Sequence, residues 1–164
     1  MAVKLSQGVE WALHCCSVLA LVPPGRTMTA ARLAEFHEVP PAYLAKQLQA
    51  LARADVIAAD PGPKGGYRLA RSADRISVLD IVLAVEGDEH AFHCEEIRQR
   101  GPAACAPAAY RRPCGIALAM GRAERAWRDE LRGTSVADLV MDLALHIHPE
   151  AAQKGATWMQ GALR

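Results

Sequence analysis

The stretch that decides the fold runs from Thr29 to Leu69 and reads TAARLAEFHEVPPAYLAKQLQALARADVIAADPGPKGGYRL. Thr29 is a candidate N-cap, because its hydroxyl can accept a hydrogen bond from a free backbone N–H of the first helical turn. Pro40 ends that helix near His37, since the residue before a proline is pushed out of the helical region. Pro41 suits the first position of a second helix, where its missing N–H costs nothing. We therefore predict two helices joined by a tight turn.

The second of these helices offers polar side chains opposite an apolar stripe. Its stripe recurs at helical spacing and faces a core, through Leu44, Leu48 and Leu51. Lysine and a helix N-terminus hold DNA phosphates, and side-chain amides pair with adenine edges in the major groove. The residues that we expect to contact DNA from this unit are Thr29, Pro41, Ala42, Tyr43, Lys46 and Gln47.

A hairpin follows at once. Residues 56–59 and 67–69 are short strand candidates, and the glycine-rich turn between them frees the backbone. Lys64 and Gly65 lie at the tip and Arg68 lies on the outgoing strand. A tip of this kind can enter a narrow minor groove, where a cation meets strong negative potential. Alone it would be an ordinary surface hairpin; directly after two such helices, it indicates a DNA-contacting wing.

Composition sets the outer limits. The chain has 164 residues, is 51% hydrophobic and carries a net charge of +1, which suits one domain or one domain with a helical extension. Residues 1–76 hold nine Lys and Arg against six Asp and Glu, and residues 77–164 hold ten against twelve. This asymmetry favours, weakly, an N-terminal half that binds DNA.

Targeting and cysteine content point to the cytoplasm. The apolar run from Trp11 to Val22 is too short to span a bilayer and lacks the features of a signal peptide, so we expect no membrane partner. Five cysteines in a reducing compartment are expected to be ligands, redox thiols or core residues instead of structural disulfides.

The rest of the chain is predicted to be mainly helical, with the small β-hairpin as its wing. A first helix over residues 4–21 precedes the helix-turn-helix, and Ser77 caps a helix that ends near Val85. The long stretch 89–113 has no clear period, and such loops are usually functional. An amphipathic helix after Cys114 is the best candidate for dimerisation, and Ser135 caps a last helix. We therefore divide the chain into a DNA-binding domain (1–86), a cysteine loop with dimerisation helices (87–148) and a loosely attached C-terminal tail (149–164).

Three cysteines mark the long loop. Cys94, Cys105 and Cys114 have the spacing C-x10-C-x8-C, which lacks the close C-x2-C pairs of a zinc knuckle. The spacing is open enough to wrap an iron–sulfur cluster, which prefers thiolates. It fits three loop thiols without a ligand equally well, so the spacing alone favours neither interpretation.

Four motifs follow one another along the chain: VEWALHCC (9–16), PPAYLAKQLQALARADVI (40–57), GPKGGYRL (62–69) and ISVLDIVLAVEG (76–87). In their content and order, residues 1 to about 140 resemble the Rrf family of bacterial winged-helix regulators, which includes IscR-like and NsrR-like iron–sulfur repressors. The resemblance implies a homodimer, a cluster near the dimerisation helix, and promoter binding that depends on cluster state. VEWALHCC and the segment FHCEEIRQRGP at 92–102 are most similar to the RsrR-type redox-sensing branch.

On this resemblance, a 2Fe–2S cluster needs two ligands besides Cys94 and Cys114. The usual family pattern has shorter gaps between its cysteines, which counts against Cys105 as a ligand. Glu10 and His14 are the best additional pair, because one helix turn places a carboxylate and an imidazole side by side. In a dimer, this pair can come from the opposite subunit. Imidazole ligation generally raises the cluster potential, which suits a sensor of redox state.

Trp11 lies between the two candidate ligands of the first helix. As a switch, it would move when the cluster charge changes and would push on the helix-turn-helix. The plainer interpretation is a half-buried tryptophan at an interface.

These features together predict a transcriptional repressor whose promoter binding is switched by the redox state of a 2Fe–2S cluster. One alternative is a cluster-free regulator that senses through a disulfide among the loop cysteines. Another is a nitric-oxide sensor that responds through nitrosylation of the cluster. A small metalloenzyme is disfavoured, because no nucleophile–base pair, phosphate loop or pair of carboxylates is found.

Overall fold

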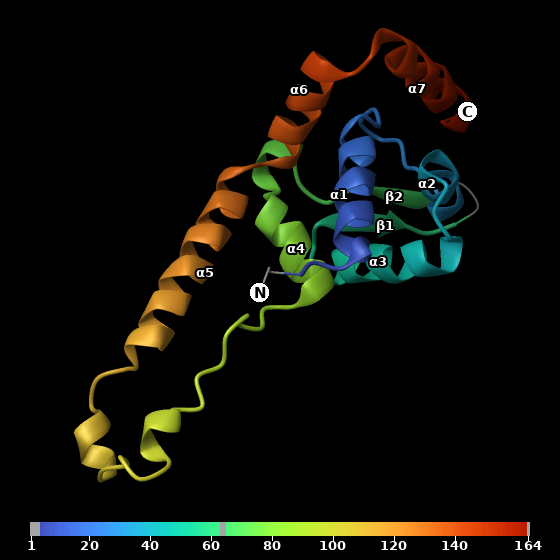
Figure 1. Ribbon diagram of the computed structural model, residues 1–164. Helices are drawn as coiled ribbons and strands as arrows, with labels where there is room; N and C mark the ends of the chain where they lie inside the picture. The colour runs from blue at the N-terminus through green and yellow to red at the C-terminus, as the bar shows by residue number, and fades with distance from the viewer. Residues whose placement is uncertain (1–3, 63–64, 164) are drawn as a thin grey trace.

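The computed structural model describes residues 4–62 and 65–163, which form a helical body with one hairpin and a long projecting arm (Figure 1). In Figure 1 the helix that starts the chain stands at the centre of the body, and the arm runs down and away from it. The elements of the described residues are α1 (Gln7–Ala20), α2 (Ala30–His37), α3 (Pro41–Arg53), β1 (Ile57–Asp60), β2 (Gly66–Leu69), α4 (Val78–Glu86), α5 (Gly115–Gly133), α6 (Val136–His146) and α7 (Pro149–Ala162), with short 3-10 turns η1 (Ala73–Arg75), η2 (Ile97–Gln99) and η3 (Pro107–Tyr110).

Helix α1 is the central element of the body, which we define as α1 to α4 with the hairpin. It packs against α3, α4 and α6. It begins at Gln7, three residues later than predicted, and Leu5 is 39% exposed. Its buried face contributes Ala12, Cys15, Cys16 and Leu19 to the main core. Helix α1 is therefore in a position to affect every other helix of the body.

The predicted helix-turn-helix is confirmed. The Thr29 hydroxyl accepts a hydrogen bond from the Arg32 N–H at 3.3 Å and caps α2. Glu38 ends α2 in the left-handed conformation with φ of 50°, so the chain turns before Pro40. The three leucines of α3 are fully buried, as the apolar stripe predicts: Leu44, Leu48 and Leu51.

The hairpin is tied to the start of α2. Strands β1 and β2 pair antiparallel, with Ile57 opposite Leu69 and Asp60 opposite Gly66. Met28 and Tyr67 exchange two backbone hydrogen bonds of 2.9 and 2.7 Å, which extends the pairing beyond the hairpin. The two strands confirm the predicted wing and lie against the helix-turn-helix.

Two capped helix starts lie side by side where the arm meets the body. The Ser77 hydroxyl accepts from the Asp80 N–H at 3.1 Å, and Ser135 caps α6 in the same way through Asp138. Val78 N–H donates to the Thr134 carbonyl, and Val136 N–H donates to the Ile76 carbonyl, both at 2.8 Å. These bonds join two segments that are far apart in the sequence.

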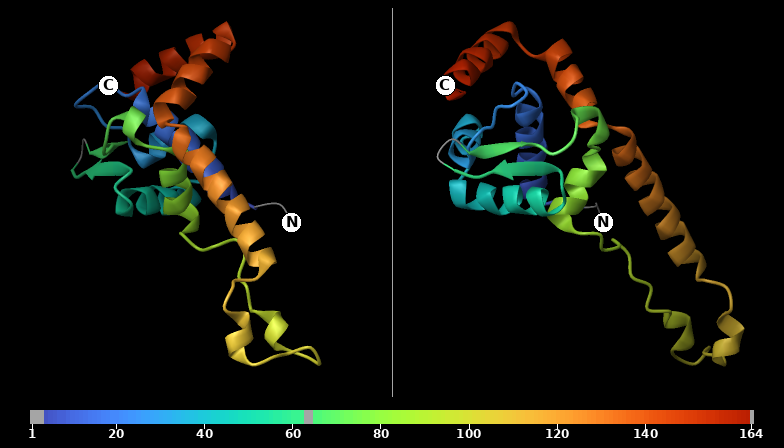
Figure 2. Two further views of the ribbon diagram at one scale, coloured as in Figure 1. Left: turned by 90° about the vertical axis from the view of Figure 1, so that its left-hand side faces the viewer. Right: turned by 180° about the vertical axis from the view of Figure 1, so that it is seen from behind.

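The arm, which we define as residues 88–133, leaves the body after Gly87 and returns through α5 (Figure 2). It contains η2, η3 and the predicted long helix α5, which has no buried residue. Trp127 and Leu131, near the C-terminal end of α5, pack against a small cluster on α1 and α4. The distal end of the arm, which holds the cysteine loop, extends away from the body.

In the segment 149–164, for which we predicted a loosely attached tail, the described residues are helical. Residues 149–162 form α7, which folds back onto α2. The Trp158 ring lies 4.8 Å from the Phe36 ring, and its Nε1–H donates to Glu35 at 3.3 Å. Trp158, with Met159, Ala162 and Leu163, packs against the main core. No helix in the described part of the chain is long and apolar enough to cross a membrane.

Candidate DNA-reading surface and cysteine loop

The exposed side of the helix-turn-helix carries most of the predicted DNA contacts. Pro41 and Ala42 are exposed in the first turn of α3, Lys46 is exposed further along, and Tyr43 is 65% exposed. Thr29 is exposed and uses its hydroxyl to cap α2. The turn end of the hairpin and the N-terminal end of α3 lie on the same side of the body (Figures 1 and 2). This placement suits a surface that spans a groove.

The predicted wing residues differ in what they contact. Gly65 is packed inside the turn, where an added Cβ would lie 2.1 Å from the Asp60 carbonyl oxygen. Arg68 is exposed and its Nε lies 3.4 Å from the Asp60 carboxylate. Lys64 falls outside the described residues. Gly65 thus shapes the turn, and Arg68 is a cation held at the hairpin.

Gln47 takes a different direction from its neighbours on α3. It is half-buried, and its carboxamide lies against Gly8 of α1, where an added Cβ would come within 2.7 Å of Nε2. Sequence reasoning assigned this amide to DNA by its place off the leucine stripe. Position on one helix does not reveal which neighbouring helix covers that flank.

The loop cysteines are free thiols. Cys94 and Cys105 are exposed, and Cys114 is partly buried at the N-cap of α5. The Cys114 thiol makes no close capping hydrogen bond, yet the backbone N–H groups of Ala117 and then Ile116 lower its pKa. The helix dipole and free N–H groups favour the thiolate at this position.

Arg98 and Tyr110 hold the loop together. Arg98 forms a two-pronged ion pair with Glu96, of which the Nη2–Oε2 contact is 2.6 Å, and donates to the Arg112 carbonyl at 3.2 Å. The Tyr110 hydroxyl donates to the Arg98 carbonyl at 2.7 Å and accepts from the Cys105 N–H at 2.8 Å. The guanidinium also interacts electrostatically with the thiols of Cys114 and Cys94. The two predicted thiol ligands therefore share one cationic neighbour.

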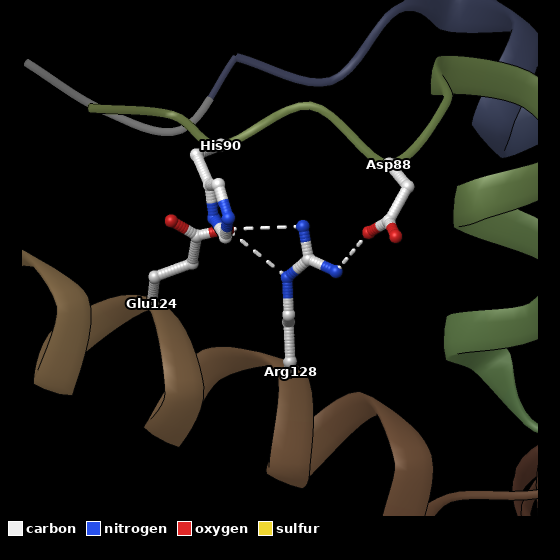
Figure 3. A network of polar contacts seen from close by, with 4 residues as sticks. All are labelled: Asp88, His90, Glu124 and Arg128. Atoms are coloured by element: carbon white, nitrogen blue, oxygen red, sulfur yellow. Dashed lines mark hydrogen bonds and ion pairs between the residues drawn. The ribbon is translucent and has the colours of Figure 1, made fainter. Parts of the chain in front are cut away.

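A polar network fastens the base of the loop to α5 (Figure 3). Arg128 pairs with Asp88 and also contacts the Glu124 carboxylate at 2.9 Å through Nη2. His90 Nδ1 lies 2.9 Å from the same carboxylate. Burial raises the pKa of Glu124, but the contacts with His90 and Arg128 outweigh it and lower that pKa. Charged groups thus join the outgoing segment of the arm to α5.

The predicted residues of α1 face outward beside α2. Glu10 and His14 are both exposed, and the His14 ring lies 5.4 Å from the ring of His37 at the end of α2. Burial, with a smaller effect from His14, lowers the pKa of His37. The His37 Nε2 atom is buried and has no hydrogen-bond partner among the described residues. Trp11 is half-buried and packs against the main core.

The four predicted ligands do not meet within one chain. Glu10 and His14 belong to α1 in the body, whereas Cys94 and Cys114 lie on the arm (Figure 2). Across residues 4–62 and 65–163, no group of three or more His, Cys, Asp or Glu side chains is placed to hold a metal ion. One chain therefore presents two separate pairs.

The other two cysteines are core residues, as their positions in α1 suggest. Cys15 and Cys16 are fully buried. Burial raises the pKa of Cys15 to about 12 and raises that of Cys16 further. Thiols of this kind are poor nucleophiles and poor ligands.

The fold and its exposed face define a winged helix-turn-helix protein of the kind that binds DNA. Residues 5–142 match the Rrf2 family, described as iron-dependent transcriptional regulators. The chain belongs to this family, and the family resemblance predicted from the sequence motifs is confirmed.

Individual relatives agree with this assignment. The chain is 34% identical over 97 residues to a Lactococcus lactis protein described as an HTH-type transcriptional regulator, a match that spans 59% of this chain and 62% of that protein. The fold of the present chain is similar to that of IscR of T. potens, with a TM-score of 0.66, 19% identity, and coverage of 90% of this chain and 94% of that one. It is also similar to CymR, the global cysteine regulator of B. subtilis, with a TM-score of 0.65, 22% identity, and coverage of 85% and 98%.

These relatives are transcriptional regulators, which agrees with the prediction that the protein is not an enzyme. The two structural likenesses establish the fold. Arg98, Tyr110, His37 and the Gly8–Gln47 contact were missed by sequence reasoning. An advance signal in the sequence existed for Arg98 alone, because CEEIRQR places this cation four residues after Cys94.

Proposed function

We propose that this protein is a transcriptional repressor that binds promoter DNA as a homodimer and releases or retains it according to the redox state of a 2Fe–2S cluster. The observation that carries the proposal is the division of ligand-type residues into two pairs. Cys94 and Cys114 lie on the arm, and Glu10 and His14 lie on α1. Each pair supplies half of the four ligands that such a cluster needs.

A second copy of the chain would complete the set. The arm leaves large apolar side chains uncovered, with Ile116 64% and Met120 40% exposed on α5. A pocket of about 270 Å³ between α4 and α5 is lined in part by Leu5, Phe92 and Met120. Contiguous exposed apolar surface marks interaction sites, and two-fold symmetric dimers are the commonest oligomers. Two copies related in this way can bring the arm of one toward α1 of the other.

The residues fit the group chemically. Iron–sulfur clusters take thiolates, and the pKa of Cys114 is lowered by helix N–H groups and by Arg98. The Arg98 guanidinium beside Cys94 and Cys114 offsets negative charge gathered at the loop. When bound, a 2Fe–2S group supplies a reversible one-electron change at physiological potentials. Cys94, Cys114, Glu10 and His14 would hold it, with Cys105 outside the ligand set.

The chain's own residues then connect the cluster with DNA. Glu10 and His14 are on the same helix as Trp11, which packs into the core of the body. A change in charge at the ligands would alter the position of Trp11 and shift α1 against the helix-turn-helix. Tyr43, Lys46 and Arg68, with the N-terminus of α3, would contact the duplex.

Visible spectroscopy of anaerobically purified protein tests the cluster. A thiolate-to-iron charge-transfer band that fades with dithionite and returns with air is the expected result. His14→Ala shifts or bleaches this band, and so does Cys114→Ser, whereas Cys105→Ser leaves it unchanged. A colourless protein after an attempt at reconstitution would refute the cluster.

A cluster-free thiol switch is the second candidate. It is favoured by three free thiols on one exposed loop and by the lowered pKa of Cys114. Its signature is DNA binding that responds to an oxidant in protein without iron or sulfide, and that is lost in Cys114→Ser. If the cluster is present but only nitric oxide, not redox cycling, changes DNA binding, the signal is nitric oxide.

A further inference from the structure

A glycine of α1 lies against a side chain of α3. Gly8 is buried in the first turn of α1. A Cβ placed there would lie 2.7 Å from Nε2, 2.8 Å from Cδ and 3.0 Å from Oε1 of Gln47. All three atoms of the carboxamide are thus within touching distance of one backbone position. Only glycine at position 8 allows the amide to lie there.

This contact joins two helices that have different proposed tasks. Gly8 lies two residues before Glu10 and three before Trp11 on the helix that carries the proposed ligands. Gln47 lies on α3, next to the exposed Lys46 and one turn after Tyr43. The two helices are packed together in the body. This amide is therefore one route by which a shift at the N-terminal end of α1 reaches α3.

We infer that Gln47 is a positioning residue that couples α1 to the DNA-reading helix α3 through its contact with Gly8. The inference rests on the proposed cluster switch and deepens it. Because the amide packs against the backbone of α1, a displacement of that backbone changes where the amide can lie, and packed interfaces change between discrete arrangements. Gln47 then acts on DNA through the placement of Tyr43 and Lys46 and not by reading a base itself.

Two substitutions remove the same contact from opposite sides. Gly8→Ala displaces the end of a flexible side chain, so the fold survives, and alanine favours a helix more than glycine does. Gln47→Ala removes the amide. The controls are Gly155→Ala in α7, where an added Cβ meets nothing within 4 Å, and Gln49→Ala, which removes an exposed amide from the same helix α3. Thermal melts followed by circular dichroism verify that each variant is folded.

The measurement is the dissociation constant of one DNA duplex in each of two cluster states, expressed as the ratio of the larger constant to the smaller. The probe is a fluorescent duplex selected from a random library by the cluster-loaded wild-type protein. Anisotropy titrations are run on air-oxidised protein and on protein reduced by dithionite, which supplies one electron per cluster. We expect Gly8→Ala and Gln47→Ala each to lower the wild-type ratio by about fivefold or more. The double variant lowers it no further, because both changes remove one contact. Both controls keep the wild-type ratio.

The outcomes separate this inference from the function on which it rests. A wild-type ratio near one refutes the cluster switch and the coupling together. A wild-type ratio that persists in Gly8→Ala and Gln47→Ala refutes the coupling alone. Equal loss of affinity in both cluster states for Gln47→Ala, with an unchanged ratio, assigns the amide to DNA and also overturns the coupling.

Discussion

The body and the arm of this protein differ in what covers their apolar residues. Nearly every buried hydrophobic residue belongs to the body, around α1 and the leucines of α3, whereas α5 buries none. The arm contacts the body through Trp127 and Leu131 of α5. An ion pair of Arg128 with Asp88 joins the outgoing segment of the arm to α5, and Ile116 is left exposed. The DNA-binding unit is thus covered within one chain, whereas the cysteine loop and α5 present uncovered surface that a second chain could contact.

The largest expected effect is on the core of the body. Leu48→Ala leaves a cavity among fully buried neighbours and should lower the free energy of unfolding by about 2–5 kcal/mol. Urea unfolding followed by circular dichroism measures it. The matched control is Leu145→Ala on α6, where the side chain is 73% exposed and the expected change is under about 0.5 kcal/mol. A comparable loss at Leu145 would show that α6 is covered in solution.

The cysteines provide the next contrast. Burial raises the pKa of Cys15 to about 12, whereas helix N–H groups lower that of Cys114. At neutral pH the thiolate fraction of Cys114 should exceed that of Cys15 by about a thousandfold or more, since even an ordinary thiol has a pKa of ~8.5. Alkylation of native cluster-free protein, read by mass spectrometry of peptides, should label Cys114 long before Cys15. Equal labelling would mean that α1 opens readily.

Association of two chains should depend on the uncovered face of the arm. Ile116→Glu puts a charge on exposed apolar surface of α5 and should weaken dimerisation by about tenfold or more. Sedimentation equilibrium measures this as a shift from two chains toward the single-chain mass of 17.7 kDa. Glu130→Gln, on an exposed position of α5, is the control and should leave the equilibrium unchanged. An undiminished dimer in Ile116→Glu would place the interface elsewhere.

The smallest effect expected is that of Arg98 on the titration of Cys114. The N–H groups of Ala117 and Ile116 lower the pKa of Cys114 more than Arg98 does, so Arg98→Met should raise it only part of the way back. Alkylation rates against pH in a cluster-free Cys94→Ser/Cys105→Ser background give the midpoint.

The lowered folded-state pKa of Cys114 also fixes the sign of its linkage to stability. The contribution is present above the thiol's unfolded-state pKa and is lost as pH falls through the lower folded value. In the alkylation experiment, a pH midpoint that is unchanged by Arg98→Met would show that the arginine does not influence the Cys114 thiol.

Local rules made most of the body predictable from the sequence. Thr29, Pro40 and the Ser77 capping box act within one turn of the chain, so their effects can be read without knowing what lies nearby. The burial of the α3 leucines could be predicted from their helical spacing alone. The hairpin could be predicted from a glycine-rich turn between two short apolar runs.

Contacts between distant segments were not predictable in this way. The docking of α7 depends on Trp158 meeting Phe36 and Glu35, and nothing near Trp158 in the sequence specifies that partner. The contact of Gln47 with Gly8 was not foreseen, because the residue pattern of one helix does not show which neighbouring helix lies against its flank. The separation of the predicted ligands between body and arm depends likewise on the direction in which α5 and the loop leave the body.

The paired backbone segments at the base of the arm have a consequence for how such proteins diversify. Val78 bonds to Thr134 and Val136 to Ile76, so the chain that leaves the body after Gly87 returns at one fixed place, beside the start of α4. Insertions or deletions between Gly87 and the end of α5 alter the length of the excursion without changing the register of anything inside the body, and each added residue costs little closure entropy. The DNA-binding body can thereby stay the same in related proteins while the arm changes in length and in the residues it carries.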